Sequence, residues 1–539
     1  MTKPANHLGG IIVAVYVAIM ACHSTTPTDQ PAQASELLET MQAMTTPIQA
    51  VVMPTEAATQ ALSPVLILQN PEEALSATPA LQVTPAPQIE AASPTPFPTV
   101  PVITLVPPAG FVVYVTRPGE TLQRLADRFE LRLEDLIYQQ PYSAEAYLPG
   151  GLQLVVPKIT GATTPPDSLL PDSELVYSPS AVGFNVEAFV NQAGGYLSTY
   201  YEDVDGQILS GAEIVQRVAN ELSVNPKLLL AVLEERSGWV YGQPKDPDQV
   251  DYPIGFMATG QVGLYDELRI AGTQLNLAYY GYKQGNYILI KFANGSALRL
   301  HPFMNAATAG LHNFFAMFYN QGTWWQKLTG LNGFMDLYQD MFGGPWARAA
   351  VEPLIPYDLA QPVLELPFPP GEYWSFTSGP HWAWNYGTPR GALDFAPANN
   401  EGRCEVSKQW ATASAAGLVV RAENNAVALD LDGDGLEQTG WVLVYLHLAD
   451  EGLIQPGAYV QVNDPLGHPS CEGGSSTGTH VHLARKYNGE WLDAEWLAPF
   501  VLSGYLVRGN GANYQGELVK GDLAIAACPY GCQGSLIKR

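Results

Sequence analysis

Positively charged residues are scarce in this chain of 539 residues, which has 26 lysines and arginines against 52 aspartates and glutamates. The formal net charge is therefore −26 at pH 7. Such a chain repels anionic phosphate unless a basic run compensates, and the sequence has none. We therefore expect no nucleic-acid partner. The length itself predicts several domains, because single hydrophobic cores do not grow to this size.

Long apolar runs are also scarce. The run "IIVAVYVAIMAC", from Ile11 to Cys22, is too short for a comfortable membrane span. With Lys3 ahead of it, the run is typical of an export signal. "IMAC" also resembles the lipobox of bacterial lipoproteins, which implies that Cys22 carries lipid and anchors the protein to a membrane. We expect residues 1–22 to be a lipoprotein-type signal peptide and the remainder to be extracytoplasmic, in the cell envelope; an uncleaved anchor or a plain signal peptide is the alternative.

Cysteine is rare as well, and five is an odd number for an exported protein unless one cysteine is otherwise occupied. If Cys22 is lipidated, the other four fall into two natural pairs, Cys404 with Cys471 and Cys528 with Cys532. Oxidising surroundings favour both disulfides. For the "CPYGC" pair, two free thiols or a metal-binding turn are alternatives, and the metal is the weaker one because no second cysteine pair accompanies it.

Residues 23–109 lack any periodic apolar face and are rich in proline, threonine and alanine, which predicts a disordered, extended tether. Residues 110–158 differ, because alternating apolar residues predict two strands, and one helix face is formed by Leu122, Leu125, Ala126 and Phe129. "YVTRPGETL" and "LPGGLQLVVP" resemble the LysM module, a small α+β unit of order βααβ. The resemblance implies binding to glycans that contain N-acetylglucosamine.

A linker, residues 159–183, precedes a mostly α-helical middle domain, residues 184–350. Its segment "NPKLLLAVLEERSGW" resembles the lysozyme-like fold of lytic transglycosylases. In that family the catalytic glutamate stands immediately before the Ser-Gly pair, where this chain has Arg236. A guanidinium cannot protonate a glycosidic oxygen, so we predict a non-catalytic spacer or glycan-binding unit. Glycan cleavage would require Glu235 to face a cleft.

Short alternating runs broken by glycine and proline fill residues 360–507 and predict a mainly antiparallel β domain. In "THVHLARKY", His480 and His482 project from one face of a strand. His447 reaches the same space if its strand is a neighbour. A histidine pair in a sheet is often an ordinary structural feature. Together with His381 and Asp394 upstream, however, one member of the pair completes the three ligands that a catalytic zinc requires.

"CEGGSSTGTHVH", with "SGPH" and Asp394 upstream, resembles the lysostaphin, LytM and staphylolysin (β-lytic) group of zinc metalloendopeptidases, above all its staphylolysin branch. The commoner pattern has a histidine four residues before the aspartate, where this chain has Arg390, so His381 must substitute through a longer loop. The resemblance implies a disulfide between Cys404 and Cys471. It also implies one zinc per chain, with these ligands and catalytic groups: His381, Asp394 and His482 as ligands, His480 as general base and His447 as oxyanion stabiliser, or the last two exchanged.

Two further features have open interpretations. "DLDGDGLEQTG", from Asp430, begins like a calcium loop, but its twelfth position is Trp441, which excludes an EF-hand. A solvated hairpin turn is predicted there, with calcium as the alternative. The loop after His381 carries Trp382, Trp384 and Tyr386, which line a cleft or pack the loop. Residues 508–539 form a glycine-rich tail to which the sequence assigns no role.

Together these features predict an exported, zinc-dependent cell-wall hydrolase that cleaves peptide bonds in the cross-links or stem peptides of peptidoglycan. A LysM module would target it to glycan, the lipid on Cys22 would hold it at a membrane, and we expect a monomer. The alternative is a catalytically silent protein that binds peptidoglycan or activates a hydrolase. The completeness of the ligand set discriminates between the two, because silent relatives usually lack at least one of the five groups.

Overall fold

The structure is a computed structural model, and it describes residues 106–136, 142–349, 351–398, 403–496 and 498–539. The predicted signal peptide, Cys22 and nearly all of the predicted tether lie outside these residues. The described residues fall within one unit of the chain, Ala86–Arg539. Among them, no helix combines the length and the apolar character that crossing a membrane requires.

The first folded segment has the strands and the first helix that its sequence predicts. Strands β1 (Phe111–Val115) and β2 (Gln153–Pro157) pair antiparallel, and helix α2 (Leu122–Phe129) follows β1. The Thr121 side chain accepts the Arg124 amide and so satisfies a free backbone donor at the start of α2. The predicted second helix is only a 3-10 turn, Leu133–Asp135, in the described part of this segment.

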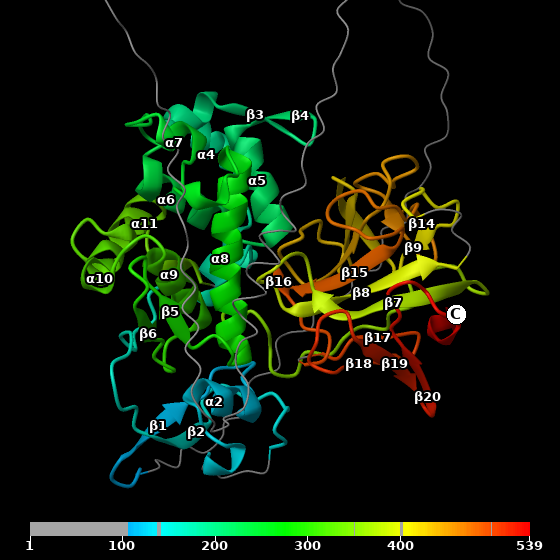
Figure 1. The fold of residues 1–539 in the computed structure, drawn as a ribbon, viewed down its shortest axis with the longest axis horizontal. Helices are drawn as coiled ribbons and strands as arrows, with labels where there is room; N and C mark the ends of the chain where they lie inside the picture. The colour runs from blue at the N-terminus through cyan, green and yellow to red at the C-terminus, as the bar shows by residue number, and fades with distance from the viewer. Residues whose placement is uncertain (1–105, 137–141, 350, 399–402, 497) are drawn as a thin grey trace, which may run out of the picture. The chain divides into compact units, whose positions relative to one another are not determined.

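Helices dominate residues 168–349, the helical region, around the long helix α8 (Leu264–Gln284), which runs through the middle of the others (Figure 1). Asn225 caps α6 with Pro226 in its first turn, as the sequence predicts. The other helices are α3 (Asp172–Leu175), α4 (Val186–Ala193), α5 (Gly211–Leu222), α6 (Pro226–Ser237), α7 (Asp248–Asp251), α9 (Ala306–Ala316), α10 (Gln321–Thr329), α11 (Phe334–Phe342) and α12 (Pro345–Arg348). Two hairpins interrupt them, β3 (Tyr201–Val204) with β4 (Gln207–Ser210) and β5 (Leu289–Lys291) with β6 (Ala297–Arg299).

Residues 364–539, the β region, contain an antiparallel sheet of nine strands in the order β13-β10-β11-β12-β15-β8-β7-β21, with β16 beside β15. The antiparallel β architecture predicted for this segment is confirmed. Its strands are β7 (Tyr373–Trp382), β8 (Arg390–Pro397), β10 (Gly417–Glu423), β11 (Ala426–Asp430), β12 (Trp441–Leu446), β13 (Tyr459–Val460), β15 (Val481–Tyr487), β16 (Glu490–Trp491) and β21 (Leu536–Lys538).

Two smaller sheets complete the β region. Strands β9 (Ala411–Thr412) and β14 (Pro465–Gly467) form one, and β17 (Val501–Leu502), β18 (Tyr505–Gly509), β19 (Gly516–Lys520) and β20 (Leu523–Ala526) form the other. The segment 508–539, to which the sequence assigned no role, therefore contributes strands. Its β21 pairs with β7 in the main sheet.

Both faces of the main sheet are buried, each in a different core. In β12, Leu443 and Tyr445 pack into the core of the β region, whereas Val442 and Val444 pack into the core of the helical region. Successive strand residues point to opposite faces, so the alternation assigns one whole face to the helices. An antiparallel sheet of this kind often leaves one face to solvent. Here the helical region takes the place of that solvent.

The hairpin formed by β15 and β16 packs so closely against the helical region that its backbone atoms contact it directly. The Ser223 hydroxyl donates to the Gly489 carbonyl, and the Tyr280 hydroxyl accepts the Trp491 amide at 3.1 Å. Lys283 pairs with the buried carboxylate of Glu490. Gly489 has a φ of +77°, and a Cβ there would overlap the carbonyl of Tyr177. Glycine is therefore the only residue that fits this contact.

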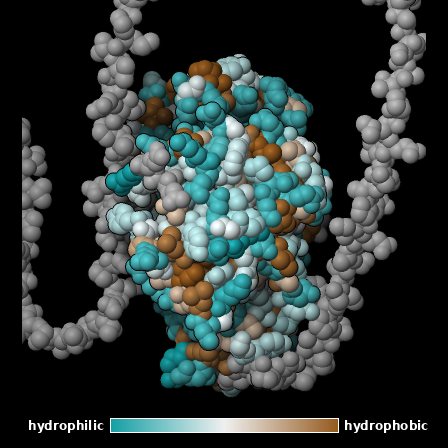
Figure 2. All heavy atoms as spheres, turned by 90° about the vertical axis from the view of Figure 1, so that its right-hand side faces the viewer, coloured by the Kyte–Doolittle hydropathy of each residue, from teal (hydrophilic) through white to brown (hydrophobic). Residues whose placement is uncertain are grey.

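Apolar residues on the exposed surface are dispersed on the face of the molecule seen in Figure 2. Brown, hydrophobic atoms occur there in small groups separated by hydrophilic ones. Large contiguous apolar patches mark binding surfaces. The dispersed apolar groups on this face give no sign of such a binding surface.

Gly489→Ala should destabilise the full chain by about 2 kcal/mol more than Gly457→Ala, because inserting a methyl group into a filled contact costs about 1–3 kcal/mol. Gly457 is the matched control, since its φ is +85° and no atom lies near a Cβ built on it. Urea unfolding of both variants gives the comparison. Equal losses would show that the hairpin is not tightly packed against the helices.

Candidate active site and metal centre

Three strands bring the predicted ligands together. Asp394 of β8 lies directly opposite His482 of β15 in the sheet register, so the two side chains share a face. His381 lies near the end of β7, where the pairing with β8 is irregular on both sides of it. Irregularities of this kind re-aim a side chain, and here they turn His381 toward Asp394 despite the long loop between them.

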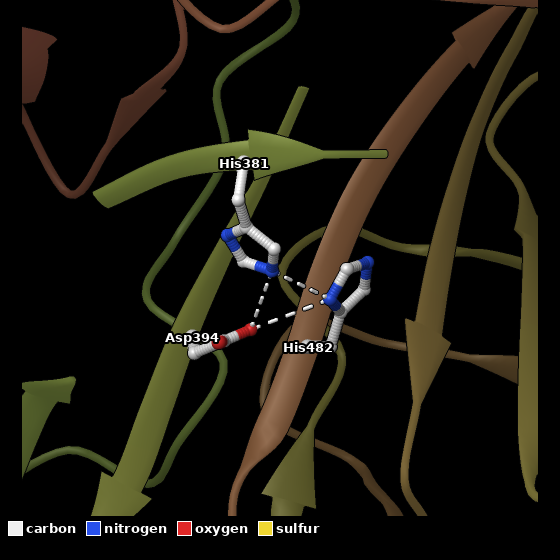
Figure 3. Close-up of side chains that lie close together, drawn as sticks. All are labelled: His381, Asp394 and His482. Atoms are coloured by element: carbon white, nitrogen blue, oxygen red, sulfur yellow. Dashed lines mark hydrogen bonds and ion pairs between the residues drawn. The ribbon is translucent and has the colours of Figure 1, made fainter. Parts of the chain in front are cut away.

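The three side chains point into one small space (Figure 3). Oδ1 of Asp394 lies 3.3 Å from Nε2 of His381 and 3.3 Å from Nδ1 of His482. The two ring nitrogens are 3.1 Å apart. All three residues are more than nine-tenths buried. Arg390, at the commoner ligand position, instead pairs with Glu495.

Backbone carbonyls fix which nitrogen of each imidazole faces this space. Nδ1 of His381 lies 3.0 Å from the Gly379 carbonyl, and Nε2 of His482 lies 3.0 Å from the Ala383 carbonyl. A carbonyl can only accept, so these nitrogens carry the protons. The opposite nitrogens therefore present lone pairs toward Asp394. Hydrogen bonds of this kind are what orient histidines as metal ligands.

The carboxylate oxygen between these lone pairs has no hydrogen-bond donor. Oδ1 of Asp394 is buried and unpartnered. Leaving a buried charged oxygen unsatisfied is costly, and two lone pairs beside it add to the cost. Ligand atoms of the three residues lie within 4.8 Å of one another, so a cation held by all three would satisfy them together. Two imidazoles and a carboxylate fit a divalent metal ion that keeps one open position.

His447 and His480 stand beside this ligand set. β12 and β15 are neighbours, as the prediction for His447 required, with Leu446 opposite His482. The rings of His447 and His480 are 4.6 Å apart, and Nε2 of His480 lies 3.6 Å from Oδ1 of Asp394. Each Nδ1 lies 2.7 Å from a carbonyl, that of Glu472 for His447 and that of Gly478 for His480. Both rings therefore also present bare Nε2 atoms.

Burial and neighbouring charge set the ionisation of these groups. Burial lowers the pKa of His447 to about 3, with the charges of His480 and His482 adding to the effect. Burial acts in the opposite sense on the pKa of Asp394, but His381 and His480 bring that pKa well below its usual value. At neutral pH the site therefore holds an ionised carboxylate beside a neutral His447 imidazole.

Tyr514 is a member of the site that the sequence did not reveal. Its ring stacks on His381 with centroids 4.9 Å apart, and its amide donates to the Pro380 carbonyl. Burial and the charge of Asp394 raise the pKa of Tyr514, so its hydroxyl keeps its proton. Tyr514 lies between β18 and β19, in the segment predicted to be an uninformative tail. No motif of the sequence marks it.

The glycine-rich segment before His480 borders the site from another side. The disulfide between Cys404 and Cys471 is present and lies at its start. A Cβ at Gly474 would lie 3.8 Å from the His447 ring, so the small residues leave space beside that imidazole. The second predicted disulfide is absent, because Cys528 and Cys532 are free thiols. A hydrogen bond between the two thiols takes its place, which is one of the alternatives left open for this pair.

The structure gives one of the three aromatic residues in the loop after His381 a packing role. Trp384 stacks on Trp491 and packs against the core of the helical region, so it holds the loop in place. Trp382 and Tyr386 pack edge to face at 5.2 Å, and both are half-buried. Trp384 therefore has a packing role, and the roles of Trp382 and Tyr386 stay predictions.

The acidic turn at Asp430 brings three carboxylates within reach of one another, Asp430, Asp432 and Asp434. Asp430 is buried and accepts the backbone amides of Asp432, Gly433 and Gly435. These bonds give the carboxylate a structural role in shaping the turn between β11 and β12.

Glu235, the remaining carboxylate near the expected acid position of the middle domain, is engaged by its neighbours. The Tyr319 hydroxyl donates to it at 2.8 Å, and Arg236 lies 3.9 Å from its other oxygen. The side chain is 14% exposed. Arg236 also stacks on Phe318 and donates to the Ile254 carbonyl, so its guanidinium is held beside Glu235 without a hydrogen bond to Oε2 of that carboxylate.

Comparison with known proteins relates this chain to metalloendopeptidases. A family model described as "LasA, N-terminal domain" matches residues 168–355. The chain is 25% identical to Protease LasA of Pseudomonas aeruginosa over 397 residues, which cover 70% of this chain and 84% of that protein. It is 30% identical to the β-lytic metalloendopeptidase of Lysobacter enzymogenes over 162 residues, which cover 28% of this chain and 83% of the relative.

Among solved structures, the chain resembles a metalloprotease of the M23 family, pseudoalterin, from the deep sea. The identity is 23% and the TM-score is 0.26, and the match covers 31% of this chain and 96% of that one.

His381→Ala should abolish tight metal binding, whereas Arg390→Ala should leave the affinity unchanged. Removing a ligand costs more than the 10- to 100-fold that the loss of an outer hydrogen-bond partner costs. Competition with a chromophoric chelator, using the full chain, measures both affinities. Tight binding by His381→Ala, or its loss in Arg390→Ala, would contradict this ligand set.

Proposed function

Since this chain belongs to the family of the LasA and β-lytic metalloendopeptidases and is itself a metalloendopeptidase, we propose that zinc is its metal and the peptide part of peptidoglycan its substrate. The observation that carries the zinc proposal is the convergence of two imidazole lone pairs on the unpartnered carboxylate oxygen of Asp394. Zinc takes three such protein ligands in catalytic sites and keeps a fourth position for water.

When bound, zinc would lower the pKa of a coordinated water and polarise the scissile carbonyl. The residues of the chain supply orientation and proton transfer. His381, Asp394 and His482 hold the ion, and the Gly379 and Ala383 carbonyls keep the two imidazoles turned toward it. Because the ligands are nearly fully buried, they are already oriented before any substrate arrives.

His480 is the proposed general base. Its Nδ1 proton is held by the Gly478 carbonyl, so the bare Nε2 is free to accept a proton from the attacking water. His447 has the same tautomer and a pKa of about 3. It can therefore donate to an oxyanion only after taking up a proton. Exchange of the two histidine roles stays open, and His447 as a neutral imidazole is the weaker base.

Tyr514 offers the hydroxyl donor that a neutral His447 lacks. Burial and the negative charge of Asp394 raise the pKa of Tyr514, so its hydroxyl is protonated at neutral pH. The effect of Asp394 also indicates that the hydroxyl lies near the ligand set. We assign it to stabilising the negative charge that develops on the substrate carbonyl oxygen. A neutral hydroxyl donor next to a developing oxyanion stabilises it and can contribute strongly to catalysis.

The peptidoglycan proposal extends to the other segments. β1, α2 and β2 are three of the four elements in the βααβ order that the LysM resemblance implies, which supports glycan binding by residues 110–158. The predicted tether, residues 23–109, and lipid on Cys22 would hold the enzyme, which we propose to be a monomer, outside the cytoplasm within reach of the wall. Tethering raises the local concentration of enzyme at its substrate without new catalytic contacts.

The silent alternative has less support. A silent relative typically lacks a ligand or a base, and here all five predicted groups lie around one space. Glycan cleavage by the helical region is also disfavoured, because Glu235 is engaged by Tyr319 and Arg236.

The full chain should bind about one zinc and release new amino termini, without new reducing sugar ends, from purified peptidoglycan. His482→Ala should lose both the metal and the cleavage, and Glu235→Gln should keep both. Metal analysis and product chemistry provide the readouts. Stoichiometric zinc with no cleavage of any peptide would favour the silent alternative, and new reducing ends lost in Glu235→Gln would favour glycan cleavage.

Tyr514→Phe should lower kcat about 100-fold, the usual cost of removing one oxyanion donor, with zinc content and KM nearly unchanged. Tyr505→Phe is the matched control, since Tyr505 is a buried tyrosine of the neighbouring strand β18, in the core of the β region. Steady-state kinetics on a soluble peptide substrate measures both. A Tyr514→Phe enzyme with unchanged kcat would remove the hydroxyl from the mechanism.

A further inference from the structure

The strand that leads to His447 would by itself turn that side chain away from the metal centre. Along β12, Leu443 and Tyr445 pack into the core of the β region, and a regular strand would point His447 the same way. His482 points to the other side of the sheet, since Leu483 beside it in β15 lies in that same core. Strand pairing alone therefore does not bring the His447 and His482 rings together.

A left-handed backbone conformation at His447 corrects this direction. β12 ends at Leu446, and His447 has a φ of +66°. Compared with an extended strand, this φ rotates the side chain about its N–Cα bond by roughly half a turn. The ring centroid accordingly lies 4.6 Å from that of His480 and 6.2 Å from that of His482. Residues other than glycine rarely adopt such a φ, so the surrounding structure must hold it.

Hydrogen bonds hold the backbone at His447 and at the residue after it. The His447 carbonyl accepts the Ser470 amide at 2.7 Å and the Ser470 hydroxyl at 3.1 Å. The Leu448 amide donates to the Asn425 carbonyl at 3.0 Å. The Leu448 carbonyl in turn accepts from the side-chain amide of Asn425 at 3.0 Å. Asn425 therefore bonds both backbone groups of the residue that follows the left-handed turn.

The same asparagine also holds the residue that selects the tautomer of His447. The Glu472 carbonyl accepts the Nδ1 proton of His447 at 2.7 Å. The Glu472 carboxylate accepts from the side-chain amide of Asn425 at 2.8 Å, and the Asp450 carboxylate accepts from it at 3.1 Å. The backbone after Glu472 lies against the asparagine as well, since a Cβ at Gly473 would be 2.6 Å from the Asn425 Cβ. Asn425 thus supports both the turn that directs the imidazole and the carbonyl that fixes its proton.

The hairpin turn between β10 and β11 explains why this position suits asparagine. Asn424 and Asn425 are its two central residues, with φ values of +51° and +61°. Asparagine and glycine accept such values most readily in a two-residue hairpin turn. Glycine would keep the turn, but it would lack the side-chain amide that reaches Leu448 and Glu472. The asparagine therefore combines the turn conformation with a donor for the support of His447.

We propose that Asn425 is a positioning residue for His447: it holds the left-handed turn that directs the imidazole toward the metal centre, and it holds the Glu472 carbonyl that fixes the tautomer. The inference rests on the proposed zinc function and deepens it, because it adds a residue that prepares the reaction. Asn425 acts through His447 and not through the three metal ligands. Its loss should therefore slow the reaction and leave zinc binding unchanged.

The test compares two glycine substitutions in one turn of the full chain. Asn425→Gly removes the side-chain amide while the turn keeps residues that suit its φ values. Asn424→Gly is the matched control, because it removes a side chain that takes no part in these bonds. We expect Asn425→Gly to lower kcat about 10-fold, the lower end for loss of an outer hydrogen-bond partner, with KM and zinc affinity unchanged. Asn424→Gly should keep kcat.

Steady-state kinetics on a soluble peptide substrate measures kcat and KM, chelator competition measures the zinc affinity, and thermal melting checks that each variant folds. An unchanged kcat in Asn425→Gly, or an equal loss in Asn424→Gly, overturns the inference. If Asn425→Gly does not fold, Glu472→Ala takes its place, because it removes the exposed carboxylate that Asn425 holds and keeps the carbonyl. An unchanged kcat in that variant would equally overturn the inference.

A double variant shows whether Asn425 acts through His447. His447→Ala should lower kcat more than Asn425→Gly does. Adding Asn425→Gly to His447→Ala should cost nothing further, because the imidazole that Asn425 positions is then gone. A further loss of about 10-fold in the double variant, the full effect of the single one, contradicts the inference.

Another readout needs neither metal nor activity. In the metal-free chain with 15N-labelled histidine, imidazole spectra should assign the proton of His447 to Nδ1, and Asn425→Gly should show a mixture of tautomers. A single, unchanged tautomer in Asn425→Gly overturns the inference. Failure of the unaltered chain to cleave any peptide would instead reject the proposed function, and the tautomer comparison would still decide whether Asn425 positions His447.

Discussion

The metal centre depends on hydrogen bonds from imidazole N–H groups to backbone carbonyls. Four histidines surround one space, and each gives its outer ring proton to a main-chain oxygen, those of Gly379, Ala383, Glu472 and Gly478. Because a carbonyl can only accept, four lone pairs are aimed inward without any side chain being needed to select the tautomers. The backbone path at these four carbonyls therefore determines the chemistry of the site.

That backbone path depends in turn on a sheet that is buried on both faces. One face packs on the core of the β region, and the other packs on the helical region, with small side chains such as Ala428 and Ala484 allowing close approach. A buried ionic cluster, in which Glu437 pairs with Arg421 and Lys486, lies between the two. Its geometry requires partners from two strands and the turn after β11, so it specifies one arrangement of those strands.

Sequence reasoning reached the parts of this protein that local pattern encodes. The i, i+2 spacing of His480 and His482 predicted a shared face, and the alternating runs predicted the antiparallel sheet. Tyr514 was missed because its contact with His381 arises from the turn between β18 and β19, which no periodicity signals. The core that the sheet shares with the helical region was missed, because a small residue such as Ala383 gives no sequence signal for burial. Only its tertiary contacts show that the helices cover it. The Cys528 and Cys532 pairing was wrong because spacing alone does not fix side-chain geometry.

The last strand of the sheet has a consequence for the order of assembly. β21 lies against β7, the strand that carries His381, although the rest of the β region separates them in sequence. Until residues 536–538 are available, β7 is an open edge with unpaired amide and carbonyl groups. A nascent chain therefore cannot complete this edge of the ligand-bearing sheet until residues 536–538 have been synthesised and pair with Tyr373–Ser375 at the start of β7.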